Sequence, residues 1–231
     1  MKKESLKIEG IPAIIWGDES DKVYIYVHGK MASKEDAQDF ANKAFPKGYQ
    51  VLSFDLPEHG DRKNENYPCM VWNGVNDLAV IGCYVHQRWN DISVCGCSLG
   101  AYFSLLAYKT LPIKKCLFLS PILNMERLMQ NMMKLFDISE ELLKKKRKIP
   151  TPMDETLYWD YYCYVRENPI EKWNVPTTVL YGSEDNLTER VVVENFSKQF
   201  GCDLSVLEGG EHWFHTEKQV AFLDEWFDKN M

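Results

Sequence analysis

The chain has 231 residues, with 34 acidic and 27 basic side chains and a formal net charge of −7. This length suffices for one large domain with a buried core and is too short for two ordinary domains with linkers, so we expect a single domain over residues 1–231. The negative charge argues against nucleic acid or an anionic membrane surface as a partner, which leaves a small molecule as the expected substrate.

We expect neither a targeting segment nor a membrane span in this sequence. Residues 1–5 are charged, and no apolar run of signal-peptide length precedes the first expected strand. No later run reaches the roughly 18 to 20 apolar residues of a membrane span, so we expect a cytoplasmic protein. The seven cysteines include no C-x-x-C pair. This pattern does not match a disulfide framework or a zinc site, and we expect neither metal nor cofactor.

Short apolar runs alternate with helical patterns along the chain, as a parallel sheet with crossover helices requires. We expect an antiparallel pair at Leu6–Gly10 and Ala13–Trp16, joined by a turn at Gly10-Ile11-Pro12. The further strands are expected at Val23–Val27, Gln50–Phe54, Ile92–Cys97, Lys115–Leu119, Thr177–Tyr181 and Leu204–Leu207. The helices are expected at Lys34–Ala44, Val71–Trp89, Leu99–Thr110, Glu189–Gln199 and Glu217–Asp228. This order predicts an α/β fold with a mostly parallel, eight-stranded sheet and helices on both faces.

Residues 121–174 interrupt the alternation, because they show no strand pattern between two expected core strands. We expect an inserted helical cap there. Its first half carries an apolar stripe with helical spacing, made of Met125, Leu128, Met129, Met132, Leu135 and Phe136. Packing against the body of the protein explains such a stripe; the alternative is a pliable acyl pocket, with Met129, Met132 and Trp159 as candidate residues. The basic run Lys144–Lys148 is expected to be a solvated helix end.

The clearest functional pattern is Gly96-Cys97-Ser98-Leu99-Gly100, a G-x-S-x-G sequence between an expected strand and an expected helix. A serine hydroxyl is a weak nucleophile unless a base can reach it, and a strained strand-to-helix turn exposes it in this way. The helix that begins at Leu99 directs backbone N–H groups toward the negative charge that develops. For the motif alone, a glycine-rich turn without chemistry is the alternative explanation.

A nucleophile of this kind requires an acid and then a histidine further along the chain. Asp185 and His212 each follow an expected strand, so both are expected at the same edge of the sheet as Ser98. The imidazole, with an ordinary pKa of about 6.5, can take the serine proton and return it, while the carboxylate orients the ring. Glu184 and His215 are the neighbouring alternatives. We prefer Asp185 and His212 because they occupy the loop positions that this order predicts.

An oxyanion hole is expected at the loop His28-Gly29-Lys30-Met31-Ala32, which follows a strand and leads into a helix. The N–H of Lys30 is the expected second donor beside the N–H of Leu99, with Met31 as the alternative. Gly29 lets the backbone turn close to the nucleophile. His28 is expected to be a structural hydrogen-bonding residue.

Over nearly its whole length the sequence resembles the α/β-hydrolase superfamily. The likeness rests on five ordered segments: His28-Gly29, the loop Asp55–Gly60, which resembles the D-x-P-G-H-G loop, the elbow Gly96–Gly100, the acid loop Gly182–Asp185 and the histidine loop Gly210–His212. The group it resembles most comprises capped carboxylesterases, monoglyceride lipases and serine aminopeptidases. Glu58 stands where that loop usually has a glycine, and the expected role of His59 is structural.

These patterns predict a serine hydrolase that cleaves small to medium acyl esters through an acyl-enzyme on Ser98. Within enzymes, the alternative is an aminopeptidase or amidase with the same triad, for which the acidic residues Asp154, Glu155 and Asp160 could bind a free amine. From another class, a ligand-binding protein with little turnover also fits the fold.

Overall fold

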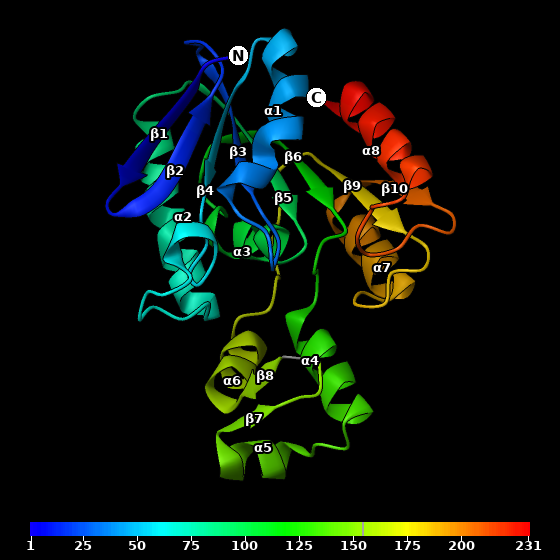
Figure 1. Ribbon diagram of the computed structural model, residues 1–231. Helices are drawn as coiled ribbons and strands as arrows, with labels where there is room; N and C mark the ends of the chain where they lie inside the picture. Colours follow the sequence, from blue (N-terminus) through cyan, green and yellow to red (C-terminus); the bar gives the residue numbers. More distant parts are fainter. Residues whose placement is uncertain (154) are drawn as a thin grey trace. The chain divides into compact units, whose positions relative to one another are not determined.

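The computed structural model describes residues 1–153 and 155–231. The chain divides into two compact units, one formed by Met1–Leu123 with Lys172–Met231 and the other by Asn124–Glu171 (Figure 1). Across the part of the chain that is described, no helix combines the length and the apolar character needed to cross a membrane. All seven cysteines have free thiols.

An eight-stranded sheet forms the centre of the first unit, in the order β1-β2-β4-β3-β5-β6-β9-β10. The strands are β1 (Lys3–Ile8), β2 (Ile11–Trp16), β3 (Lys22–Val27), β4 (Gln50–Phe54), β5 (Asp91–Cys97), β6 (Ile113–Leu119), β9 (Thr177–Gly182) and β10 (Asp203–Leu207). Only the pairs β1–β2 and β2–β4 are antiparallel. The predicted eight-stranded, mostly parallel sheet is therefore confirmed.

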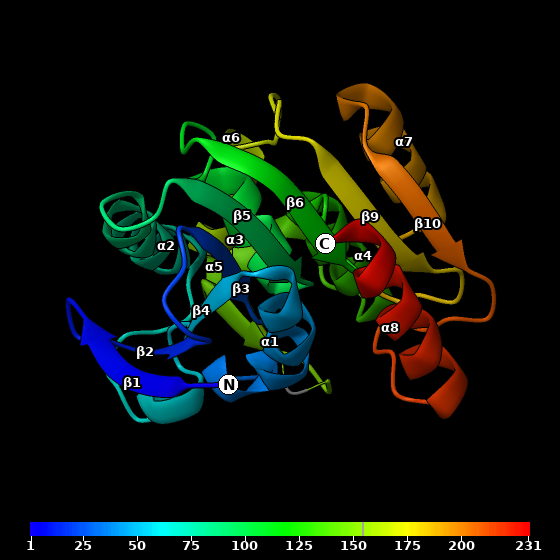
Figure 2. The same cartoon turned by 90° about the horizontal axis from the view of Figure 1, so that it is seen from above.

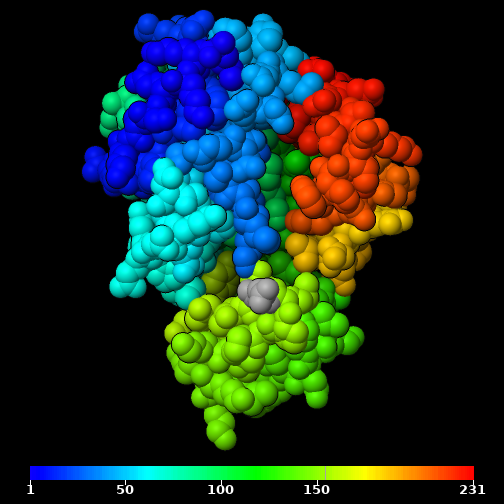
Figure 3. All heavy atoms as spheres, viewed as in Figure 1, coloured from blue at the N-terminus to red at the C-terminus, as the bar shows by residue number. Residues whose placement is uncertain are grey.

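Helices cover both faces of this sheet. They are η1 (Lys34–Ala37), α1 (Gln38–Ala44), η2 (Phe45–Lys47), η3 (Gly60–Arg62), α2 (Val71–His86), α3 (Leu99–Ala107), α7 (Arg190–Phe200) and α8 (Glu217–Asn230). Figure 2 shows α1 and α8 on one face and α2 and α3 on the other, and Figure 3 shows α8 at the surface. Phe40 of α1 contacts both the sheet and α8: its ring lies 5.1 Å from the ring of Tyr24 on β3 and 5.1 Å from that of Phe227 on α8.

Two helices end earlier than the sequence pattern predicts, α2 before Trp89 and α3 before Thr110. Trp89 follows the end of α2 and donates from its indole N–H to Oε1 of Gln50, at 2.9 Å. This contact joins it to the sheet, and the apolar pattern of the sequence did not distinguish it from a further helical turn.

The turn between β1 and β2 lies at Glu9-Gly10, so the predicted turn at Gly10-Ile11-Pro12 is wrong. Ile8 pairs with Ile11, and the two turn residues have φ angles of 47° and 90°. A two-residue hairpin turn with positive φ at both positions matches the twist of the flanking strands. Pro12 lies within β2, where pairing with β4 begins only at the next residue.

The second unit contains α4 (Met125–Leu135), α5 (Glu140–Lys146), β7 (Lys148–Pro150), β8 (Thr156–Tyr158) and α6 (Trp159–Glu167). The expectation that residues 121–174 contain no strand is wrong, because β7 and β8 form an antiparallel pair. Strands this short are shorter than the runs in which apolar and polar residues alternate recognisably. The basic run Lys144–Lys148 is exposed, as predicted; it begins in the last turn of α5 and ends at the first residue of β7.

The apolar stripe of α4 differs from the predicted one. Met125, Met129 and Met133 are buried, and their spacing of four residues places them on one face of the helix. Leu135 is 68% exposed, so its assignment to the stripe is wrong. It is the last residue of the helix, and an apolar side chain at a helix end need not share the buried face.

The hairpin turn makes a testable prediction about stability. Asparagine adopts positive φ more readily than glutamate, so Glu9→Asn should raise the free energy of unfolding by about 0.5 to 1 kcal/mol in urea denaturation. The matched control is Glu9→Gln, which removes the charge without this preference and should leave the stability unchanged. Equal stability of the two variants would contradict the turn assignment.

Candidate active site

Ser98 lies between β5 and α3 in a strained backbone conformation, with φ 48° and ψ −112°. A Cβ atom at Gly96 would come within 2.8 Å of the Cα of Ala101, and one at Gly100 within 2.3 Å of the carbonyl oxygen of Val27. Both distances are below normal contact, so only glycine lets the strand and helix approach this closely. The two glycines of the motif thus permit the turn that presents Ser98.

His212 links Asp185 to Ser98. Its Nδ1 atom lies 2.7 Å from Oδ2 of Asp185, and its Nε2 atom lies 2.9 Å from Oγ of Ser98. A carboxylate oxygen can only accept a hydrogen bond, so Nδ1 carries the proton and Nε2 of the neutral ring accepts from the serine hydroxyl. The side chain of Asp185 is fully buried and that of His212 is 16% exposed.

Backbone groups orient the carboxylate of Asp185. Its Oδ1 atom accepts from the N–H groups of Leu187 at 2.8 Å and Thr188 at 2.9 Å, which leaves Oδ2 for the histidine. The hydroxyl of Tyr181 donates to the carbonyl of Thr188 at 2.9 Å and so fixes the same turn. The sequence pattern indicated Asp185 itself but none of these supporting contacts.

The acid and histidine loops pack backbone to backbone. A Cβ atom at Gly182 would lie 2.4 Å from the carbonyl oxygen of Gly210, and the N–H of Glu184 donates to that oxygen at 2.8 Å. A side chain at either glycine would separate the two loops. Their close packing sets the distance between Asp185 and His212.

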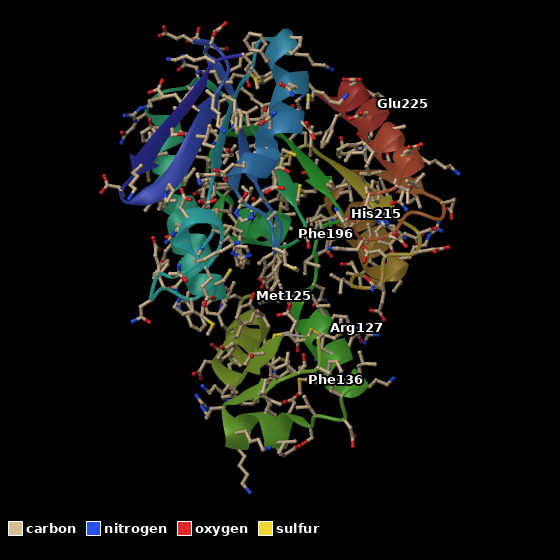
Figure 4. All side chains as sticks on the ribbon, viewed as in Figure 1. Met125, Arg127, Phe136, Phe196, His215 and Glu225 are labelled. Carbon is tan, nitrogen blue, oxygen red and sulfur yellow. The ribbon has the colours of Figure 1, made fainter. Side chains whose placement is uncertain are left out.

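The neighbouring alternatives lie elsewhere. Glu184 is exposed. His215, labelled in Figure 4 between β10 and α8, is exposed; its Nδ1 atom lies 2.9 Å from the carbonyl oxygen of Trp213 and 3.2 Å from Oε2 of Glu211. Among these candidates the structure therefore brings Asp185 and His212 together with Ser98.

The loop after β3 approaches the nucleophile at Gly29. A Cβ atom there would lie 3.3 Å from both the Cβ of Ser98 and the carbonyl oxygen of Cys97. Lys30 and Met31 follow directly, and Leu99 is the first residue of α3. The loop is thus placed where a backbone donor could act, and the assignment of Lys30 or Met31 as that donor stays a prediction.

His28 fixes the start of this loop. Its Nδ1 atom lies 2.7 Å from the carbonyl oxygen of Gly29, and its Nε2 atom accepts from the N–H of Leu56 at 3.0 Å. Both contacts require the neutral ring with its proton on Nδ1. Burial lowers the pKa of His28 to about 4. The ring of His59 is also buried, with Nδ1 2.7 Å from the carbonyl oxygen of Pro57.

Glu58, where the sequence pattern leads one to expect a glycine, adopts a positive φ of 61°. Its carboxylate accepts from the N–H of Cys69 at 2.6 Å. Glu58 thus has a backbone conformation that favours glycine, and its side chain accepts a hydrogen bond from a neighbouring segment.

The three pocket candidates belong to the second unit. Met129 is buried on α4, Met132 is half-buried on the same helix, and Trp159 begins α6. Met125 and Phe136 lie at opposite ends of α4 in Figure 4. The ring of Trp159 lies 6.0 Å from that of Tyr162 within this unit. The acyl-pocket assignment stays a prediction.

Because His28 is buried and neutral, we predict that the free energy of unfolding depends on pH. Between about pH 6.5 and pH 4 the unfolded chain binds a proton at His28 that the folded protein does not, so stability falls as the pH falls through this window. The loss should reach about 3 kcal/mol. Urea denaturation across this range should show a weaker pH dependence for His28→Gln than for the wild type.

The exposed His86 supplies the control, and a His86→Gln variant should keep the wild-type dependence. Identical pH profiles for wild type and His28→Gln would contradict this account.

The comparisons with known proteins concern the fold. No protein-family profile matches the sequence, and no curated protein does. Est1E from Butyrivibrio proteoclasticus with bound ferulic acid is similar in structure, with 19% identity, a TM-score of 0.76, and coverage of 98% of this chain and 96% of that one. A putative hydrolase from Agrobacterium vitis S4 has 12% identity, a TM-score of 0.78 and coverage of 99% and 98%. The Pyrococcus furiosus esterase Pf2001 has 19% identity, a TM-score of 0.70 and coverage of 99% and 90%. Together with the sheet order, these similarities show that the chain has the α/β-hydrolase fold.

Proposed function

We propose that the protein is a serine hydrolase, specifically a carboxylesterase that cleaves small to medium acyl esters. The observation that carries this proposal is the hydrogen-bonded chain from Asp185 through His212 to the hydroxyl of Ser98. A neutral imidazole that accepts from a serine hydroxyl is the arrangement of a general base with its nucleophile.

In the proposed acylation step, Oγ of Ser98 attacks the carbonyl carbon of the ester while its proton passes to Nε2 of His212. The N–H groups of Leu99 and Lys30 stabilise the negative oxygen of the tetrahedral intermediate. When the intermediate collapses, His212 gives the proton to the oxygen of the leaving alcohol, and the acyl group stays on Ser98. The ionised Asp185 stabilises the imidazolium and does not itself take the proton.

In the deacylation step, water attacks the acyl carbon and passes a proton to His212. Collapse of the second tetrahedral intermediate breaks the bond to Ser98, whose oxygen recovers the proton from His212. The net reaction adds one water to the ester and releases a carboxylic acid and an alcohol.

The choice of ester over amide rests on sequence resemblance and on the neighbours, which include a protein named as an esterase and one with ferulic acid bound. The amidase alternative depended on acidic residues of the second unit. Asp160 is ion-paired with Arg147, and Glu155 also interacts with other residues. Asp154 lies outside the described residues. No described contact therefore favours an amine site.

We predict that the protein hydrolyses simple esters faster than matched aminoacyl amides. Ser98→Ala and His212→Ala should each lower kcat by about a thousandfold or more, and the double variant should lose no more, because the three residues act as a unit. Asp185→Asn should lower kcat by less than either of these two substitutions. Steady-state kinetics on folded protein checks these values.

His215→Ala is the matched control and should keep wild-type turnover. An active His212→Ala with an inactive His215→Ala would contradict the assignment of the base. Preference for the amides would contradict the ester assignment, and binding of esters without turnover would favour a ligand-binding protein.

The pocket assignment gives a separate prediction. One methylene in a hydrophobic pocket changes binding by roughly 1 to 3 kcal/mol, so Met132→Trp should shift the preferred acyl chain to shorter esters, with ratios of kcat/KM changing about tenfold. A series of esters of graded chain length measures this on variants checked for folding, because overpacking also lowers stability. An unchanged profile would mean that the methionines serve only packing.

A further inference from the structure

Residues 28–33 connect β3 to η1 and contain the backbone donor that the proposed function assigns to the oxyanion hole. The inference below rests on that function. A backbone donor stabilises the transition state best when it is held in place before the reaction. The contacts that hold residues 28–33 in place therefore matter for this donor.

The end of the loop is attached to Asp55 at the end of β4. The backbone N–H of Lys34 donates to Oδ1 of Asp55 at 2.9 Å, and its ammonium donates to Oδ2 at 2.8 Å. The N–H of Asp61 also donates to Oδ2, at 2.9 Å. The side chain of Asp55 has no exposed surface, and that of Lys34 is 5% exposed. This buried carboxylate therefore receives three donors and joins the loop to β4.

The start of the loop is attached to the next residue of the same segment, because His28 accepts from the N–H of Leu56. The guanidinium of Arg62 donates to the carbonyl of Asp55 at 3.1 Å and steadies that segment. His28, at the start of the loop, and Lys34, the residue after its end, are thus attached to the consecutive residues Leu56 and Asp55.

Inside the loop, Met31 adopts a φ of 64° and is 94% exposed. This left-handed conformation is disfavoured for a residue with a side chain, and burial does not compensate for it here. A disfavoured conformation persists only when the surroundings impose it. The attachments at the two ends of the loop supply that constraint.

The charge at Lys34 suits this role. Its ammonium also lies 2.8 Å from Oδ2 of Asp61 and 3.0 Å from Oε1 of Glu35. Burial disfavours the charged form, but the hydrogen bonds to Asp55, Asp61 and Glu35 outweigh it and raise the pKa of Lys34. The ammonium therefore stays charged at neutral pH.

We propose that Lys34 is a positioning residue for the oxyanion hole. Through the carboxylate of Asp55 it fixes the far end of residues 28–33 and keeps the backbone donor at Lys30 or Met31 directed at the carbonyl oxygen of the substrate. Without it, Met31 can relax to a negative φ and turn the donor away.

The test compares kcat, KM and the affinity of a boronic acid, which forms a tetrahedral adduct with the serine oxygen. Lys34→Met should lower kcat by about tenfold or more and weaken boronate binding by a similar factor, while KM changes by less than about twofold. Lys34→Arg, which keeps the positive charge and N–H donors for Asp55 and Asp61, should recover most of the loss.

Lys43→Met is the matched control, because Lys43 pairs with Asp224 and Asp228 of α8 and should change neither quantity. If circular dichroism shows that Lys34→Met does not fold, Lys34→Gln, which keeps an N–H donor, replaces it with a smaller expected loss. A folded Lys34 variant whose kcat and boronate affinity stay within about twofold of wild type would overturn the inference. A loss of kcat with unchanged boronate affinity would overturn it as well. A wild-type protein without ester turnover would instead contradict the proposed function.

Discussion

The bond between Nδ1 of His212 and the carboxylate of Asp185 determines the rest of the candidate site. A carboxylate only accepts, so this contact sets the tautomer of the ring and leaves Nε2 able to accept from Ser98. The backbone donors to Asp185 restrict the carboxylate to one orientation. The absence of side chains at Gly182 and Gly210 lets the two loops meet at the distance that the bond requires. These residues together keep the proton of His212 on Nδ1.

A second buried carboxylate, that of Asp55, is attached to the loop that follows β3. Asp185 orients the side chain of His212, whereas Asp55 orients backbone through Lys34 and Asp61. Each carboxylate is placed by the end of a central strand, β9 or β4, and each accepts several N–H donors. The parallel sheet is a suitable support, because its carboxyl ends collect such loops at one edge.

The sequence predicted the sheet well, because apolar strand patterns alternate clearly with helical ones. It also indicated which loops carry Ser98, Asp185 and His212: Ser98 follows β5 directly, and the other two lie in the loops after β9 and β10. Local pattern was sufficient there. Local pattern was not sufficient where a contact joins residues far apart in the sequence. Lys34 pairs with Asp55, 21 positions away, and no periodicity indicates that partner. The Glu9 turn and the short strands β7 and β8 were missed because non-glycine residues with positive φ and three-residue strands leave no clear signal.

The central claim is that Ser98 is a nucleophile activated by His212, and covalent labelling tests it most directly. Folded protein would be treated with an organophosphonate, digested and analysed by peptide mass spectrometry. The account predicts one stoichiometric adduct on Ser98 that is nearly abolished in His212→Ala and retained in His215→Ala. An adduct on another residue, or no adduct on folded wild-type protein, would contradict it.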